Sequence, residues 1–141
     1  MNFIQPLTAS ITFSFAAANR VRVARFAGAI TDRELIDAYE RLLRDPAYDG
    51  TLHDLVDLRE VSHMGITSAG LHRLIALYDG RGPTEAHTRN AIVAPTDVLY
   101  GVSRMFQTLW GDSRLAELEV FRTIGAAEHW IAEHSDVPAS D

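Results

Sequence analysis

Thr67 and Ser68 are adjacent hydroxyl side chains at the start of a segment with helical spacing, and His63 precedes them by a few residues. A histidine within reach of a hydroxyl can act as the base that activates a nucleophile. The GxSxG pattern of hydrolases is incomplete around Ser68, because Ile66 stands in the place of its first glycine. A hydroxyl at a helix start is ordinarily an N-cap that accepts hydrogen bonds from backbone amides. We therefore predict no catalytic residue in this chain.

Five residues are candidates for binding a small ligand, namely His63 and the four described next. Asp57 lies at the predicted carboxyl end of a strand, where open α/β sheets form ligand crevices. Arg104 lies near Tyr100 on a predicted helix and Arg122 ends a predicted strand, and a guanidinium can hold an anion through two hydrogen bonds. Asp54 points to the opposite strand face from Asp57, which argues against a catalytic carboxylate pair. The alternative interpretation of Asp57 is a carboxylate that bonds to loop amides. The alternative interpretation of Arg104 and Arg122 is that both are solvated surface arginines.

The composition excludes several classes of chemistry. The chain has 141 residues without cysteine, so disulfides, thiolate zinc sites, iron–sulfur ligation and cysteine nucleophiles are absent. All 13 residues counted as Lys+Arg are arginine, which removes Schiff-base lysines and the lysine of the phosphate-binding GxxxxGK[ST] loop. The six histidines contain no pair with the helical spacing of HExxH. We predict neither a bound metal nor a cofactor.

The charge balance is acidic. A net charge of −6 and a pI near 5.4 oppose general binding to nucleic acids or anionic membranes. Three nearby arginines, Arg20, Arg22 and Arg25, are interpreted as a solvated edge because they divide between two strand faces and no aromatics interleave. No signal-peptide pattern and no apolar run of membrane-spanning length occurs. We expect a cytoplasmic protein without a nucleic-acid partner or a membrane span.

Hydrophobic periodicity predicts an alternating ββαβαβαβα order. Residues 11–15 and 21–23 alternate as a β-hairpin, in which Asn19 suits a left-handed turn position. Thr31 and Glu34 have capping-box spacing before a helix that ends at Pro46. The later elements follow from alternating or helical spacing and turn residues: strand 52–58, helix 67–78 ended by Gly80, Gly82 and Pro83, strand 91–94, helix 96–110, strand 118–122 and helix 126–131.

The expected fold is a single α/β domain over residues 10–135, with tails at 1–9 and 136–141. Strands joined through helices are parallel with right-handed crossovers, and the hairpin adds an antiparallel amino-terminal edge strand. We predict a five-stranded mixed sheet in the order 1-2-3-4-5, with helices mainly on one face. That order would place every helix on one side. A doubly wound sheet is the alternative, because residues 91–94 look buried on both faces.

A resemblance to STAS domains, the fold of bacterial anti-sigma-factor antagonists, comes from residues 56–71, which read VDLREVSHMGITSAGL. In that family a strand ends in Asp-Leu, and a turn with Asp-Ser-Ser-Gly-Leu opens the next helix. Residues 100–106 (YGVSRMF) and 120–122 (VFR), with Ala127 and Trp130, resemble a STAS-like family of small bacterial proteins. The resemblance covers roughly residues 10–134. It implies Thr67 or Ser68 as the phosphoacceptor position, while Gly65 replaces the family's Asp.

The resemblance implies a non-catalytic regulatory or protein-interaction domain, in which the second helix and the loop before it meet a regulatory protein partner. A small-molecule or lipid-binding domain is the alternative, since CRAL-TRIO domains share a related βα arrangement. An uncharacterised hydrolase is a third class. We also expect a homodimer, formed through the edge strand or the semi-polar sheet face, because an unprotected edge invites pairing.

Overall fold

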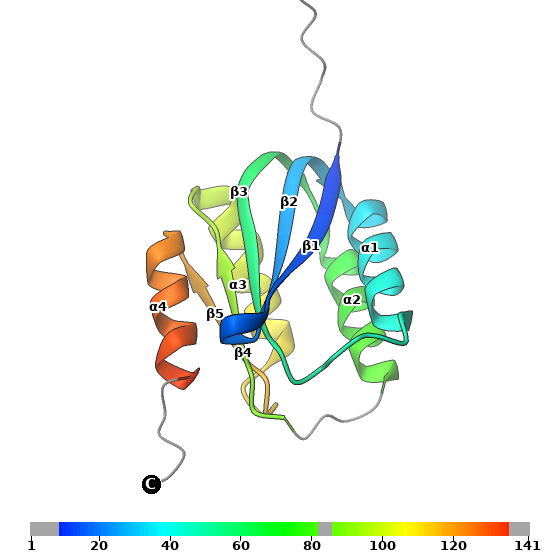
Figure 1. Cartoon of the computed structure of the whole chain (residues 1–141). Coiled ribbons are helices and arrows are strands. Elements are labelled where there is room, and N and C mark those ends of the chain that lie inside the picture. The colour runs from blue at the N-terminus through cyan, green and yellow to red at the C-terminus, as the bar shows by residue number, and fades with distance from the viewer. Residues whose placement is uncertain (1–8, 82–85, 136–141) are drawn as a thin grey trace, which may run out of the picture.

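Five strands and four α-helices alternate along residues 9–81 and 86–135, the part of the chain that the computed structural model describes (Figure 1). Gly82, Pro83 and nearly all of the predicted tails lie outside it, so the domain limits stay predictions. The elements are β1 (Ser10–Ala16), the 3-10 turn η1 (Ala17–Asn19), β2 (Val21–Thr31), α1 (Asp32–Arg44), β3 (His53–Gly65), α2 (Ser68–Gly80), β4 (Arg89–Val93), α3 (Asp97–Trp110), β5 (Glu117–Phe121) and α4 (Ile124–Ser135).

The sheet has the predicted order, β1-β2-β3-β4-β5, with β1 antiparallel to β2 and all other neighbours parallel. The turn between β1 and β2 differs from the prediction, because Arg20 rather than Asn19 has the left-handed conformation, with φ at 59°. Strands β2 and β3 are also longer than predicted. The extra length of β2 contains small residues, Ala27, Gly28 and Ala29, that weaken the alternating pattern.

Helices α1, α2 and α3 cover one face of the sheet, and α4 covers part of the other (Figure 1). The prediction of helices mainly on one face is therefore confirmed, but the expectation that every helix lies there was wrong for α4. The reason is a second apolar surface on β3 and β4, where Leu55, Ala91 and Val93 pack against Ala127 and Ile131. The two-sided burial of β4 that suggested a doubly wound sheet is real, and α4 accounts for it.

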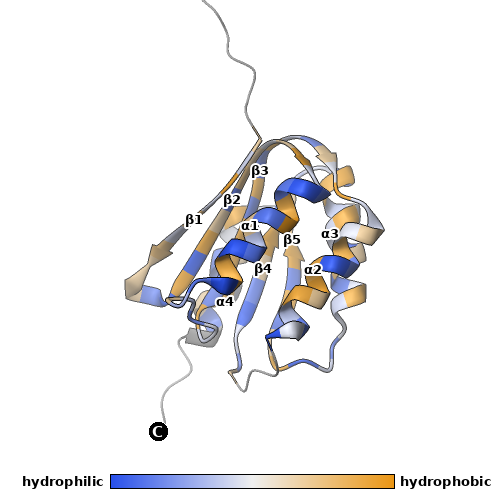
Figure 2. Cartoon of the chain, turned by 90° about the vertical axis from the view of Figure 1, so that its right-hand side faces the viewer, coloured by the Kyte–Doolittle hydropathy of each residue, from blue (hydrophilic) through white to orange (hydrophobic). Residues whose placement is uncertain are grey.

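The main core lies between the sheet and the three-helix layer, which stands in front of the sheet in Figure 2 with apolar segments along the helices. Ile30 and Leu35 lie in it together with Ile92 and Leu99. A chain of ring contacts extends from β1 through the helices to the end of α3, through Phe13, Tyr39, Tyr78 and Trp110. Burial of large apolar and aromatic side chains is the dominant stabilising term in such a core.

Helices α1, α2 and α3 all begin where a parallel strand ends. The end of the sheet formed by the carboxyl ends of these strands is called the carboxyl edge below. A threonine stands at each start. Thr31 and Glu34 form the predicted capping box, in which the Thr31 N–H donates to Glu34 Oε1 at 2.7 Å. The Thr67 and Thr96 hydroxyls accept from the N–H groups of Gly70 and Leu99. The opposite side, where the strands begin and these helices end, is the amino edge.

Candidate functional site

Thr67 and Ser68 lie at the carboxyl edge, at the start of α2, as predicted. The Thr67 hydroxyl has two partners: it donates to Asp32 Oδ2 at 2.5 Å and accepts from the Gly70 N–H at 3.2 Å. The Thr67 N–H also donates to Asp32 Oδ1 at 2.8 Å. Ser68 is exposed, and its side chain has no hydrogen bond within the described residues. The two hydroxyls therefore differ, since one is held in place and the other is free to react or bind.

Asp32 and Gly70 are in close contact across the starts of α1 and α2. A Cβ placed on Gly70 would lie 2.0 Å from Asp32 Oδ1 and 2.3 Å from Asp32 Cγ, far inside contact distance. The absence of a side chain at Gly70 lets the Asp32 carboxylate reach the N-cap of the neighbouring helix. We call this arrangement of Asp32, Thr67 and Gly70 the N-cap clamp. Its effect is to fix the start of α2 to the start of α1.

His63 is exposed near the end of β3 and makes no hydrogen bond to Thr67 or Ser68 in the described structure. The base–nucleophile pair considered from the sequence is therefore not formed. Three histidines near β3 and α2 do not converge either, because His53 begins β3, ten residues before His63 near its end. His53 is buried at the amino edge, and its Nδ1 accepts from the Arg89 N–H at 3.0 Å. His72 lies exposed on α2.

The structure brings Tyr100, Arg104 and Arg122 together beside the first half of α3. The Arg122 guanidinium carbon lies 4.2 Å from the centre of the Tyr100 ring, and that of Arg104 lies 6.0 Å from it. Arg122 also pairs with Asp97 at 3.0 Å. Both arginines are exposed and retain unused N–H groups. This cation–π cluster, which we call the arginine pair, brings three of the sequence candidates together.

The outward side of α3 carries two exposed apolar side chains next to the arginine pair. Val98 is 64% exposed and Met105 is 39% exposed. They are seven residues apart, so they share a helix face, and the exposed Gly101 lies between them. The three residues form a solvent-facing apolar stripe that begins at the carboxyl edge.

Asp57 lies on the other sheet face and away from these groups. It is in the middle of β3, not at the end of the strand, although the pairing of β3 with β4 ends there with Asp57 opposite Val93. The carboxylate is buried and accepts from the Arg59 N–H at 3.0 Å and from the Arg59 guanidinium at 2.9 Å. Burial by itself raises the pKa of Asp57, and the bonds from Arg59 outweigh this and lower it. Asp57 is thus a buried carboxylate on a strand that accepts its hydrogen bonds from Arg59.

A cleft of about 800 Å³ opens at the amino edge, where no candidate had been predicted. Its walls come from the loop before β3, the ends of α2 and α3, and the starts of β4 and β5; they include Tyr48, Tyr78, Arg81, Trp110 and Arg114. None of these segments has a motif of its own. The site is formed only when the topology brings the separate segments together.

Asp54 lines this cleft and forms an ion pair with Arg22 from the neighbouring strand. Arg22 is 6% exposed, so the interpretation of this residue as part of a solvated edge was wrong. Its Nε and Nη2 donate to the two Asp54 oxygens at 2.7 and 3.1 Å. The sequence contained one signal, since Arg22 shares strand parity with the core residues Ala24 and Phe26. Arg20 and Arg25 are exposed, as expected.

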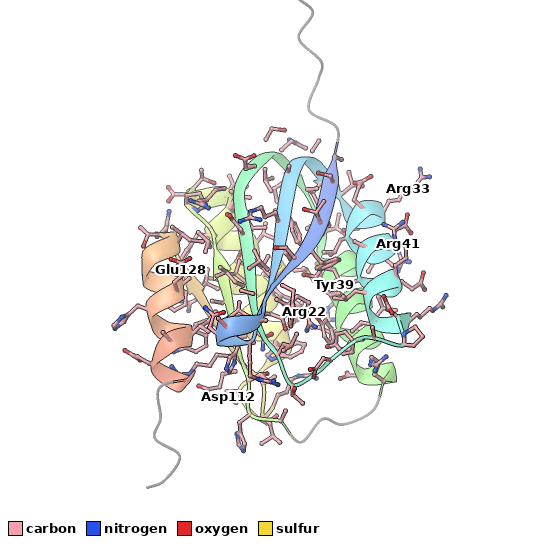
Figure 3. All side chains as sticks on the ribbon, in the orientation of Figure 1. Arg22, Arg33, Tyr39, Arg41, Asp112 and Glu128 are labelled. Atoms are coloured by element: carbon pink, nitrogen blue, oxygen red, sulfur yellow. The ribbon has the colours of Figure 1, made fainter. Side chains whose placement is uncertain are left out.

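Burial sets the protonation behaviour around this pair. Loss of water raises the pKa of the Asp54 carboxyl, because attraction to Arg22 only partly offsets it. Burial lowers the pKa of Arg22, while the charge and hydrogen bonds of Asp54 raise it overall. Burial also raises the pKa of the three surrounding phenols, those of Tyr39, Tyr48 and Tyr78. In Figure 3, Arg22 and Tyr39 lie toward the interior of the molecule, whereas Arg41 points outward from α1.

Three further observations bear on binding. The apolar void between the sheet and the three-helix layer, lined by Phe26, Leu74 and Phe106 among others, measures only about 60 Å³. Within residues 9–81 and 86–135, no group of three or more histidine and acidic side chains is arranged to hold a metal ion. Among the helices of that same part, none has the length and apolar character needed to cross a bilayer.

The order of elements and the five-stranded sheet with its antiparallel edge strand define an α/β domain with a STAS-like fold. No protein-family model and no curated protein sequence matches the chain. Among solved structures, the chain is similar to an uncharacterized protein of the DUF3478 family with a SpoIIAA-like fold from Shewanella loihica PV-4. The two are 13% identical, the match covers 93% of this chain and 98% of that one, and the TM-score is 0.53. The likeness establishes the fold.

Proposed function

We propose that the protein is a non-catalytic interaction module that binds a regulatory protein partner at its carboxyl edge. The docking face consists of Ser68, the apolar stripe of Val98, Gly101 and Met105, and the arginine pair with Tyr100. The observation that carries the proposal is the apolar stripe, with Val98 64% and Met105 39% exposed beside two exposed arginines. Arginine, tyrosine and methionine are enriched at protein interfaces.

The chemistry of the docking face suggests the chemistry of its partner. The stripe offers apolar contact along two turns of α3, and the arginine pair adds positive charge to a protein with a net charge of −6. Asp97 neutralises part of that charge through Arg122. A partner segment with apolar side chains and flanking carboxylates would complement this arrangement.

Two other classes receive less support from the geometry. The histidine–hydroxyl pair considered for a hydrolase is not formed, because His63 bonds to neither Thr67 nor Ser68 in the described structure. A lipid binder needs an apolar cavity of several hundred Å³. The void under the helices, at about 60 Å³, would have to open widely to hold an acyl chain.

For modification of the docking face, we favour Ser68 over Thr67 as the phosphoacceptor. A phosphate on Thr67 would place its charge against the Asp32 carboxylate and break the N-cap clamp. Ser68 is exposed and stands in the first turn of α2, where a dianion meets the positive end of the helix dipole. Modification there would add negative charge to the docking face and weaken binding of an acidic partner.

The test is site-specific photocrosslinking in the cells that produce the protein. A photoreactive side chain at Val98 should capture one protein, and the matched position Arg41, exposed on α1, should not. Replacing Met105 by Glu in the Val98 probe should abolish the adduct, because it adds charge to the apolar stripe. The same adducts from both positions, or an adduct that survives Met105→Glu, would contradict the proposed docking face.

A second copy of the chain is the partner expected for the edge strand. The outer edge of β1 is unpaired in the described structure, and Phe15 on that strand is 61% exposed. The homodimer therefore remains a prediction, separate from the docking face. Analytical ultracentrifugation of the wild type and of Phe15→Glu measures it directly.

A further inference from the structure

The amino-edge cleft lies at the other end of α2 and α3 from the docking face. Its volume of about 800 Å³ is within the range of small-molecule sites in proteins. We propose that this cleft binds a small organic monocarboxylate with an aromatic or apolar body, and that Arg81 holds the carboxylate.

Among the described residues that line the cleft, one cation has no carboxylate partner. Asp54 is paired with Arg22, and Asp79 is paired with Arg114 at 2.8 Å. Arg81 donates to the Leu43 carbonyl and lies 4.6 Å from the centre of the Tyr48 ring, but no carboxylate in the described chain pairs with it. Its exposed guanidinium keeps N–H groups for a ligand. A carboxylate fits because it accepts two parallel hydrogen bonds from such a group.

The walls next to Arg81 are aromatic and apolar. Tyr78 and Trp110 meet edge to face with ring centres 5.4 Å apart, and Leu115 is 38% exposed. The hydroxyl of Ser113 adds a polar group to the rim. Rings of this kind bind flat or apolar ligand bodies, so the carboxylate would carry an aromatic or branched apolar group.

The Asp54 carboxylate, which lines the cleft, limits the ligand to a single negative charge. Asp54 lines the cleft with 17% of its side chain exposed, and its oxygens already accept both bonds that Arg22 offers to them. A second carboxylate on the ligand would approach Asp54 with no cation left to receive it. Dicarboxylates and phosphate dianions should therefore bind less well than monocarboxylates.

The experiment is an amide NMR titration with phenylacetate, its neutral analogue phenylacetamide and the dicarboxylate phenylsuccinate, followed in parallel by tryptophan fluorescence. Phenylacetate should shift the amides of residues 78–81 and 113–116 and bind about tenfold or more tightly than either analogue. Arg81→Gln should remove the preference for phenylacetate over phenylacetamide. The matched variant Arg41→Gln, an exposed arginine on α1, should keep it.

A second variant provides a test of the cleft that does not require Arg81→Gln to fold. Ser113→Trp places a large ring in the cleft from an exposed rim position and should abolish binding of every probe. The proposal is overturned if phenylacetate binds no better than phenylacetamide, if the shifts map outside the cleft, or if folded Arg81→Gln keeps the preference. These results do not depend on the docking face, and the Val98 and Met105 variants should bind phenylacetate normally.

Discussion

Replacing Gly70 by alanine tests the N-cap clamp. The new Cβ would lie 2.0 Å from Asp32 Oδ1, so the carboxylate must move and lose its bonds from the Thr67 N–H and hydroxyl. Each bond to a half-exposed carboxylate contributes about 1–1.5 kcal/mol. Alanine gains about 1 kcal/mol of helix propensity over glycine. The net expectation is a loss of about 1–2 kcal/mol in the free energy of unfolding, or roughly 3–8 °C in melting temperature.

The assay is guanidinium denaturation followed by circular dichroism, with the midpoint and slope fitted together. Gly101→Ala on α3 is the matched control, because nothing lies within 4 Å of its new Cβ. That variant should be stabilised by about 0.5–1 kcal/mol. In an Asp32→Ala background, Gly70→Ala should also become stabilising, since the obstructing carboxylate is gone. The reasoning is refuted if Gly70→Ala stabilises the wild type, or if its cost is unchanged without Asp32.

Two other predictions concern the buried groups of the amino edge. Arg22→Met should cost about 3–5 kcal/mol because it leaves Asp54 buried without its cation, and the double variant with Asp54→Leu should recover most of the loss; equal denaturation midpoints for the single and double variants would contradict this. Burial raises the pKa of three phenols above the value of about 10 that they have in the unfolded chain. The free energy of unfolding should therefore keep its full value below pH 10 and fall at higher pH, where the phenols ionise first in the unfolded chain. Phenolate absorbance should then show these phenols ionising together with unfolding, and early ionisation in the folded protein would disprove the burial of Tyr39, Tyr48 and Tyr78.

The sequence was sufficient for the order of elements, because the strands and helices are marked by local patterns that do not depend on distant residues. The capping box of α1 and the threonine at the start of α3 are local patterns of this kind. The ends of β2 and β3 were not predictable in the same way. Beyond Asp57, β3 pairs only with β2, so the exposed Arg59 and Glu60 interrupt the apolar pattern of a strand that nevertheless continues.

The candidate sites show the same difference between local patterns, which the sequence reveals, and contacts between distant segments, which it does not. Thr67 could be placed from the sequence because it starts a helix, whereas Tyr100, Arg104 and Arg122 were separate candidates whose proximity comes from the fold. The amino-edge cleft was missed because its lining comes from separate segments that share no pattern. Arg22 was misjudged because its partner, Asp54, is 32 residues away in the chain and becomes its neighbour only through the pairing of β2 with β3.

The sheet order repeats the chain order, and this affects how the protein can assemble during synthesis. Each strand leaving the ribosome finds its neighbour already made, so pairing can advance from β1 to β5 without waiting for a later insertion. The face that α4 covers is the exception. Until the residues after Phe121 emerge, Val21, Leu55 and Val93 stay uncovered. A nascent chain stalled at that stage would present an apolar surface of the kind that chaperones bind.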